Sequence, residues 1–243
     1  MSTEARPAFY ALAPGGARDY VTLLHPPYTA WHLSYVVIGA AIAPTWQPGR
    51  LGATLLAFFL AVGIGAHALD ELHDRPLATQ IPSRVLGWLA ACSIAAAVGI
   101  GIAGAIRYDL WLLVFVAAGT FAVLAYNLEL LGGRVHSDVW FALFWGGFPL
   151  LTAYFACAEE LRWEAVLAAV FAVLSSYAQR RLSSPVRRLR REVTAVGGTI
   201  ELKDGTREPI TRETLIVGNE AALRALAAAM VALAIALVVL RAA

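Results

Sequence analysis

The chain has 243 residues, of which 59% are apolar and only 15% are charged. Soluble domains carry about 25% charged residues, so this composition excludes an ordinary soluble domain and indicates a membrane protein. The formal net charge is only +2, which gives no reason to expect nucleic acid as a partner.

Residues 1–27 are expected to form a cytosolic N-terminal segment. They contain Pro7, Pro14 and Gly15, and they lack a continuous apolar stretch of the length that a cleavable signal peptide requires. The protein is therefore expected to insert into the membrane through its own spans.

The apolar segments that follow are long enough to cross a hydrocarbon core of about 30 Å as helices. They cover residues 28–46, 51–69, 86–106, 109–128, 138–157, 163–179 and 219–240. Such spans form helices because a helix satisfies its own backbone hydrogen bonds where no water is present. The predicted fold class is an all-α integral membrane protein, a bundle of about seven transmembrane helices.

Basic residues predict the orientation of these spans. If the N-terminus is cytosolic, most of the 19 Lys and Arg residues fall on the cytosolic side, and the exceptions are Arg50, Arg107, Arg162 and Arg241. By the positive-inside rule, the N-terminus is cytosolic and the C-terminus lies outside. We expect the membrane to be the cytoplasmic membrane of a bacterium or an archaeon.

Acidic and histidine side chains gather just after the second span. Asp70 and Asp74 are four residues apart, so a helix places both carboxylates on one face. Two carboxylates at this spacing suit Mg²⁺, which they would bind together with phosphate oxygens and water. His67 and Glu71 lie on the same side and could orient these ligands. The alternative is a solvated helix end at which Arg75 neutralises Asp70 or Asp74.

The run Asp70-x-x-x-Asp74-Arg75-Pro76-Leu77-Ala78 resembles the first aspartate-rich motif of the UbiA superfamily of membrane-embedded prenyltransferases. Further segments resemble the family in the same order along the chain: Pro26-Pro27-Tyr28-Thr29 leading to Val37-Ile38-Gly39-Ala40-Ala41, then Ala125-Tyr126-Asn127, then Trp145-Gly146-Gly147-Phe148-Pro149. The resemblance covers residues 20–182, and residues 28–182 would form a UbiA-like transmembrane bundle.

The resemblance implies a bundle around a central cavity that opens to the cytosolic face. An isoprenyl diphosphate would be the donor, Mg²⁺ would hold its diphosphate, and an aromatic or other lipophilic acceptor in the membrane would receive the prenyl group. The metal would stabilise the departing diphosphate, and a dry cavity would protect the allylic cation from water. Tyr126, Asn127 and Tyr177 would contact the substrate, although interfacial tyrosines also anchor spans.

The chain departs from the family at both aspartate-rich motifs. His67 follows Ala66 where the family has Asn-Asp, so His67 either replaces that function or hydrogen-bonds Glu71. After Tyr177-Ala178, the positions of the family's second acidic motif hold Arg181 and Pro185. This protein therefore looks like a divergent, shortened member of the family without the second aspartate-rich motif.

Arginines follow the sixth span in place of those acidic residues. Arg180 and Arg181 either contact the diphosphate directly, since guanidinium groups match phosphate geometry, or anchor the span near anionic lipid. Lipid anchoring is the expected role of the residues that continue the basic run, which are Arg187, Arg188, Arg190 and Arg191.

Residues 183–217 are expected to form a basic cytosolic segment that carries a small β-hairpin. Polar and apolar residues alternate from Thr199 to Thr214, and Asp204-Gly205 favours a tight turn. An isolated hairpin is marginally stable, so it should pack against the cytosolic end of the bundle or a partner. It would then serve as a lid, an interaction module or a connector. Residues 218–243 are predicted to be a C-terminal transmembrane helix.

Two functions follow from these features. The first is transfer of a prenyl or polyisoprenyl group from an isoprenyl diphosphate, with Asp70 and Asp74 holding Mg²⁺, His67 and Glu71 supporting them, and Arg75, Arg180 or Arg181 neutralising phosphate. The alternative is a non-catalytic UbiA-like membrane subunit that binds a lipid, quinone or pigment. The family usually has two more spans, so a partner protein or a second copy could complete the bundle.

Overall fold

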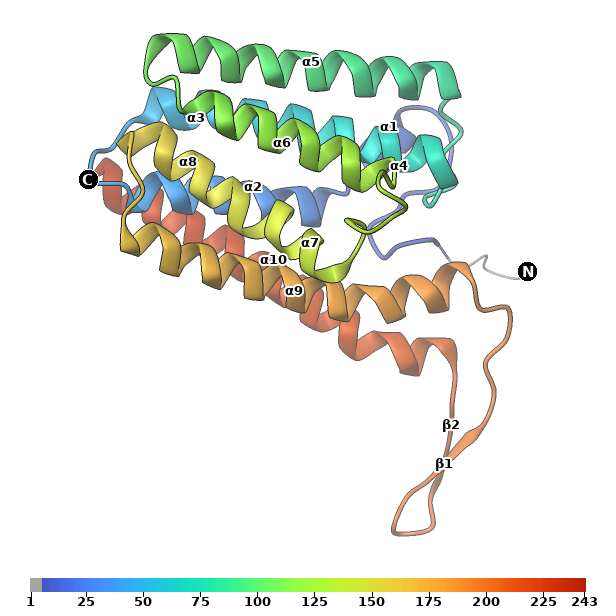
Figure 1. Ribbon diagram of the computed structural model, residues 1–243. Coiled ribbons are helices and arrows are strands. Elements are labelled where there is room, and N and C mark those ends of the chain that lie inside the picture. The colour runs from blue at the N-terminus through green and yellow to red at the C-terminus, as the bar shows by residue number, and fades with distance from the viewer. Residues whose placement is uncertain (1–5) are drawn as a thin grey trace.

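The computed structural model describes residues 6–243, and nearly all of their regular structure is helical (Figure 1). The helices are α1 (Ala17–Leu23), α2 (Pro26–Ile42), α3 (Pro48–Phe58), α4 (His67–Asp74), α5 (Ser83–Arg107), α6 (Leu112–Asn127), α7 (Asp138–Ala142), α8 (Phe148–Ala158), α9 (Trp163–Arg191) and α10 (Arg212–Ala242). Two π-helical segments, η1 (Phe59–Ala66) and η2 (Leu143–Gly147), join α3 to α4 and α7 to α8.

The long helices run side by side in one bundle. Helix α5 lies at one edge, and α9 and α10 lie at the opposite edge (Figure 1). Helix α2 packs against α8 and α10 in the interior. The bundle therefore has an interior helix whose residues contact protein on several sides, which suits its fully buried Trp31 and Tyr35.

Four helical stretches within residues 6–243 are long and apolar enough to cross a membrane: Pro48–Asp74, Ser83–Arg107, Asp138–Ala158 and Arg212–Ala242. They suggest a membrane protein, and the prediction of a mainly helical membrane bundle is confirmed to this extent. The prediction of seven spans is not confirmed. Helices α2 and α6 have only 17 and 16 residues, and the apolar part of α9 runs into its arginine-rich second half.

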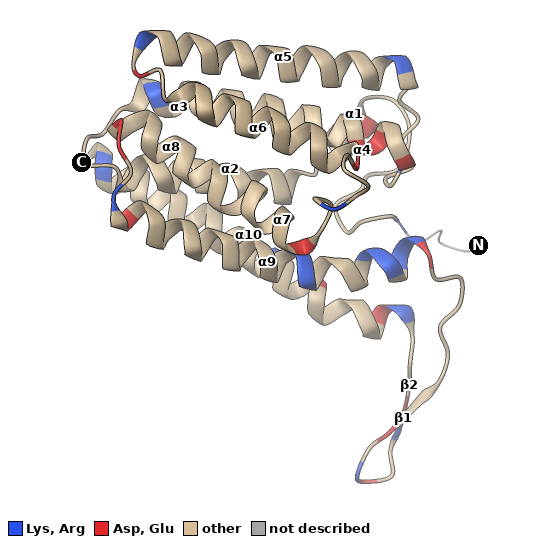
Figure 2. Cartoon of the chain, in the orientation of Figure 1, with Lys and Arg blue, Asp and Glu red and all other residues tan. Residues whose placement is uncertain are grey.

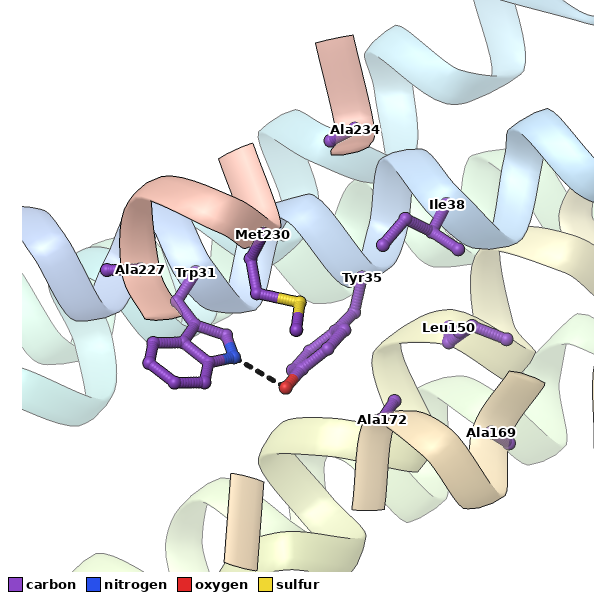
Figure 3. Close-up of a cluster of buried hydrophobic side chains, with 9 residues drawn as sticks. All are labelled: Trp31, Tyr35, Ile38, Leu150, Ala169, Ala172, Ala227, Met230 and Ala234. Carbon is purple, nitrogen blue, oxygen red and sulfur yellow. Dashed lines mark hydrogen bonds between the residues drawn. The ribbon is translucent and has the colours of Figure 1, made fainter. Parts of the chain in front are cut away.

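The interior of the bundle is built on small residues and a few large aromatic ones. Trp31 and Tyr35 of α2 pack with Met230 of α10, and the Trp31 indole N–H donates to the Tyr35 hydroxyl (Figure 3). A Cβ added at Gly39 would lie 2.2 Å from the carbonyl oxygen of Leu150. Helices α2 and α8 therefore touch backbone to backbone, as small residues allow between membrane helices.

The hairpin prediction is confirmed. Strands β1 (Thr199–Glu201) and β2 (Arg207–Pro209) are antiparallel, with Ile200 paired with Glu208, and Gly205 adopts φ +84° in the turn. The expected packing against the bundle is not seen, because the hairpin projects away from it (Figure 1) and both strands are fully exposed. In this arrangement the hairpin does not act as a lid over the described part of the bundle.

Candidate functional site

Charged residues of distant segments meet at one end of the bundle. Helix α4 ends there at Asp74, α6 ends at Asn127, and α7 begins at Asp138. Figure 2 shows the acidic residues of α4 and the basic second half of α9 at this same end. We call it the α4 end, and the candidate site residues of the sequence analysis all lie on segments that reach it.

The two aspartates of the motif lie in different surroundings. Asp74 is in the last turn of α4, its side chain is 76% exposed, and its closest ionic contact is His73 at 3.8 Å. Asp70, one turn earlier, is partly buried, and among the described residues it has neither an ion pair nor a hydrogen bond. No group of three His, Cys, Asp or Glu residues within residues 6–243 is arranged to hold a metal ion. Of the two aspartates, only Asp70 is partly buried.

Glu71 and Arg75 fold the loop that follows α4. The Glu71 carboxylate is fully buried, and it accepts hydrogen bonds from the Leu77 N–H at 2.9 Å, the Thr79 N–H at 2.8 Å and the Thr79 hydroxyl at 2.9 Å. The Arg75 guanidinium donates to the carbonyls of Thr79 and Ile81. Arg75 makes no ion pair with Asp70 or Asp74 in the described chain, so the alternative in which it neutralises one of these aspartates is not seen, and its guanidinium binds the loop instead.

His67 contacts other groups than the sequence analysis considered. Its Nδ1 is 3.1 Å from the carbonyl oxygen of Gly63 in η1, and its ring stacks on His25 with 4.0 Å between centroids. It does not hydrogen-bond Glu71 in the described structure, because the oxygens of Glu71 accept from the loop instead. His67 thus connects the π-helical segment, which often marks functional sites, to the start of α2.

A buried pair missed by the sequence analysis completes this side of the α4 end. The Tyr10 hydroxyl is 2.8 Å from Nδ1 of His25, and the Tyr10 ring also packs edge-on against Tyr28. Burial lowers the pKa of His25 well below 6.5, and nearby His67, Arg191 and Arg187 lower it further. Burial likewise raises the pKa of Tyr10. Both groups are therefore neutral, and the N-terminal segment is tied to the bundle through them.

Tyr126 and Asn127 differ in how their polar atoms are used. The Tyr126 side chain is 5% exposed, its ring stacks on His136 at 4.3 Å, and its hydroxyl has no hydrogen-bond partner within the described chain. The Asn127 amide donates to the Val123 carbonyl of its own helix at 2.7 Å. Of this predicted pair, Tyr126 alone has a buried polar atom left for a ligand.

The predicted site residues of α9 also differ in how exposed they are. Arg180 is 15% exposed, and its Nε donates to Asp138 at 3.0 Å. Arg181 is 67% exposed, with its guanidinium 3.6 Å from the same carboxylate, and Tyr177 is exposed. The structure therefore brings Arg180 to the interior of the α4 end and leaves Arg181 and Tyr177 at the surface.

The four arginines expected to anchor lipid do not share one environment. Arg188 is exposed, Arg190 pairs with Glu220 at 2.7 Å, and the Arg191 Nε donates to the Pro7 carbonyl at 3.4 Å. Arg187 is partly buried, and burial together with Arg180 and Arg191 lowers its pKa to about 10. Its position was missed because the run was read as one block, although the spacing from Arg180 places both on one helical face.

An apolar cavity of about 140 Å³ lies between α3, η1, α5, α6, η2 and α8. It reaches Arg50 and Tyr108 at the far end of the bundle, and Val62, Val123 and Trp145 nearer the α4 end. These last three residues pack with Tyr126 in one hydrophobic cluster. Trp145 therefore lines the cavity and packs against Tyr126, which lies at the end of α6 that reaches the α4 end.

Comparison of the chain with known protein families, with curated proteins and with solved structures finds no significant match. The geometry of the α4 end and the cavity is therefore the basis for assigning a function.

Loss of the Glu71 carboxylate should destabilise the protein. Glu71→Gln puts an amide N–H₂ against one of its three donors, which should lower the free energy of unfolding by about 1–3 kcal/mol. Asp74→Asn is the matched control, because a change at this exposed site should cost less than about 0.5 kcal/mol. Thermal unfolding in detergent measures both. Equal stability of the two variants would contradict the structural role of Glu71.

Acid should destabilise the fold through His25. Because the pKa of His25 is lowered in the folded state, the unfolded chain alone takes up a proton just below pH 6.5, and the free energy of unfolding falls as the pH falls. His25→Gln removes this titration and should flatten the decline in melting temperature between about pH 7 and pH 5. His73→Gln changes an exposed histidine and should keep the wild-type slope. An unchanged slope in His25→Gln would refute the assignment.

Proposed function

We propose that this protein transfers a prenyl or polyisoprenyl group from an isoprenyl diphosphate to an aromatic or other lipophilic acceptor in the membrane, as a divergent UbiA-like prenyltransferase. One observation carries the proposal. The charged α4 end, with Asp70 and Arg187, lies next to an apolar cavity whose wall residue Trp145 packs against Tyr126. An isoprenyl diphosphate has the same division into an anionic head and an apolar tail.

Asp70 is the residue that would hold Mg²⁺. Mg²⁺ in such sites takes one or two carboxylates and completes its coordination with phosphate oxygens and water, so a single inward carboxylate fits this demand. Bound Mg²⁺ would stabilise the negative charge that develops on the departing diphosphate. Asp74 is too exposed to share that role here, and Glu71 contributes by fixing the loop after α4.

The apolar cavity would take the tail of the donor. Its walls are formed mainly by apolar side chains such as Phe58, Ile94 and Phe148, with a few polar residues such as Arg50 and Tyr108 at the far end. The apolar walls offer an isoprenoid chain extensive contact and offer water few polar partners. Exclusion of water would protect an allylic cation from capture. In this proposal the α4 end faces the cytosol, and the C-terminus lies at the outer end of the bundle.

A non-catalytic subunit that binds a lipid, quinone or pigment is the second candidate. Two observations favour it. Asp74 is exposed, and the Glu71 carboxylate is occupied by the loop after α4. Asp70 is then the one carboxylate of the motif left for a metal ion. Such a subunit would bind its lipid, quinone or pigment without releasing pyrophosphate, and a partner protein or a second copy would complete the bundle.

Substitution of the two aspartates should separate their roles. The affinity for farnesyl diphosphate in the presence of Mg²⁺ is measured from the quench of tryptophan fluorescence. We expect Asp70→Asn to lower this affinity by about tenfold or more, because the Asp70 carboxylate is partly buried. Asp74→Asn should stay within about twofold of wild type. Pyrophosphate release with a membrane lipid extract as acceptor distinguishes transfer from binding. An unchanged response in Asp70→Asn would overturn the proposal.

Filling the cavity should block the tail and spare the headgroup. Ala97 lines the cavity, whereas its neighbour Ala96 is exposed on the outer face of α5. Ala97→Phe should weaken binding of farnesyl diphosphate by about tenfold and leave binding of inorganic pyrophosphate unchanged. Ala96→Phe is the control and should bind both ligands as wild type does. Equal affinities of the two variants for farnesyl diphosphate would place the tail elsewhere.

A further inference from the structure

Arg187 occupies the centre of an inward face of α9. Arg180, Ser184, Arg187 and Arg191 follow one another at spacings of three and four residues, so they lie on one side of the helix. Arg180 contacts Asp138 of α7, and Arg191 contacts Pro7 of the N-terminal segment. Arg187 therefore lies between two arginines that contact α7 and the N-terminal segment.

The partners of the partly buried arginines on α9 differ in one respect. Arg180 has the Asp138 carboxylate at 3.0 Å, and Arg190 has the Glu220 carboxylate at 2.7 Å. Arg187 and Arg191 have no carboxylate within ion-pair distance among residues 6–243, although Asp70 is close enough to interact electrostatically with both. Arg191 donates to the Pro7 carbonyl at 3.4 Å, and Arg187 donates only to the Ser184 hydroxyl at 3.3 Å. A partly buried guanidinium without a counter-ion is unfavourable, and an anion from outside the chain would relieve this.

A second, independent group points to the same ligand. The Tyr126 hydroxyl is buried and has no hydrogen-bond partner in the described structure. Tyr126 and Tyr28 are both among the groups near enough to Arg187 to influence its charge. A phenol O–H donates readily to a phosphate oxygen, so a guanidinium and an unused hydroxyl donor are available in the same part of the α4 end.

We propose that Arg187, flanked by Arg180 and Arg191 and assisted by the Tyr126 hydroxyl, binds a phosphate or diphosphate group directly and without a metal ion. Guanidinium groups bind phosphate through paired charge-assisted hydrogen bonds. The inference rests on the proposed function for the identity of the ligand, the diphosphate of an isoprenoid. It assigns the principal anion contact to a residue that the sequence analysis had given to lipid anchoring.

Binding without metal tests the inference. The full chain in detergent with EDTA is titrated calorimetrically with inorganic pyrophosphate and, separately, with farnesyl diphosphate. Arg187→Gln should weaken both affinities by about tenfold or more, and Arg187→Lys should recover part of the loss. Arg188→Gln alters the exposed neighbour and should stay near wild type. Wild-type affinity in Arg187→Gln, or no binding of pyrophosphate by the wild type in EDTA, overturns the inference.

Stability gives a readout that does not depend on activity. Pyrophosphate should raise the melting temperature of the wild type in EDTA, because a ligand that binds only the folded state stabilises it, and Arg187→Gln should lose this shift. Without ligand, Arg187→Gln should melt no lower than the wild type, since it removes an uncompensated charge. A large loss of stability without ligand would instead show that Arg187 supports the fold, and it would refute the inference.

The outcomes separate this inference from the proposed function. If farnesyl diphosphate binds only with Mg²⁺ and Arg187→Gln binds it normally, prenyl transfer stands and the arginine site fails. If pyrophosphate binds through Arg187 in EDTA while no pyrophosphate is released from farnesyl diphosphate with Mg²⁺, the arginine site stands and transfer fails. Tighter binding of farnesyl diphosphate than of pyrophosphate identifies a lipid headgroup as the ligand, and equal binding identifies free phosphate.

Discussion

The buried carboxylate of Glu71 is the interaction on which the α4 end depends. Its three donors belong to residues 77–79, and Arg75 binds carbonyls of the same loop, so the chain folds back on α4 with its buried polar groups satisfied. This fold-back fixes α4 directly after η1. His67 and Asp70 are thereby held at the interior, whereas Asp74 remains at the surface. The three acidic residues of α4 therefore have different roles. Glu71 holds the loop, Asp70 is a candidate ligand contact, and Asp74 is exposed to solvent.

Two partly buried residues of opposite sign at the α4 end, Asp70 and Arg187, are left outside the ion pairs of its described residues. Asp138 with Arg180 and Glu220 with Arg190 form partly buried ion pairs, while Asp70 and Arg187 have no such partner in residues 6–243. In a medium of low dielectric constant, charges left in this way are costly, and a bound anion together with a cation would compensate both. The cavity behind Tyr126 adds an apolar region to this site, so one amphiphilic ligand would satisfy the charges and fill the space.

The sequence predicted features that depend on local pattern. Apolar length gave the helical bundle, Asp204-Gly205 gave the hairpin turn, and the Asp70 motif located the α4 end. The number of spans is not confirmed, because apolar length alone does not show where a helix ends or that the second half of α9 is polar. Some contacts could not be predicted, because they depend on how a loop folds or on segments distant in sequence. These are the contacts of Glu71, Arg75 and His67 and the hydrogen bond between Tyr10 and His25. The partial burial of Arg187 was not predicted, because burial of one arginine in a basic run is decided by packing.

The proposed contact of Arg187 changes what such a site does with a diphosphate. In the family that the sequence resembles, a second set of aspartates reaches the phosphate only through Mg²⁺, whose charge stabilises the departing group. A guanidinium reaches the phosphate without a metal and orients it through paired hydrogen bonds, but it adds only one positive charge. Asp70 as the one inward carboxylate of its motif, opposite Arg187, therefore favours firm binding of the headgroup. Transfer would then depend on the charge that a metal held by Asp70 adds.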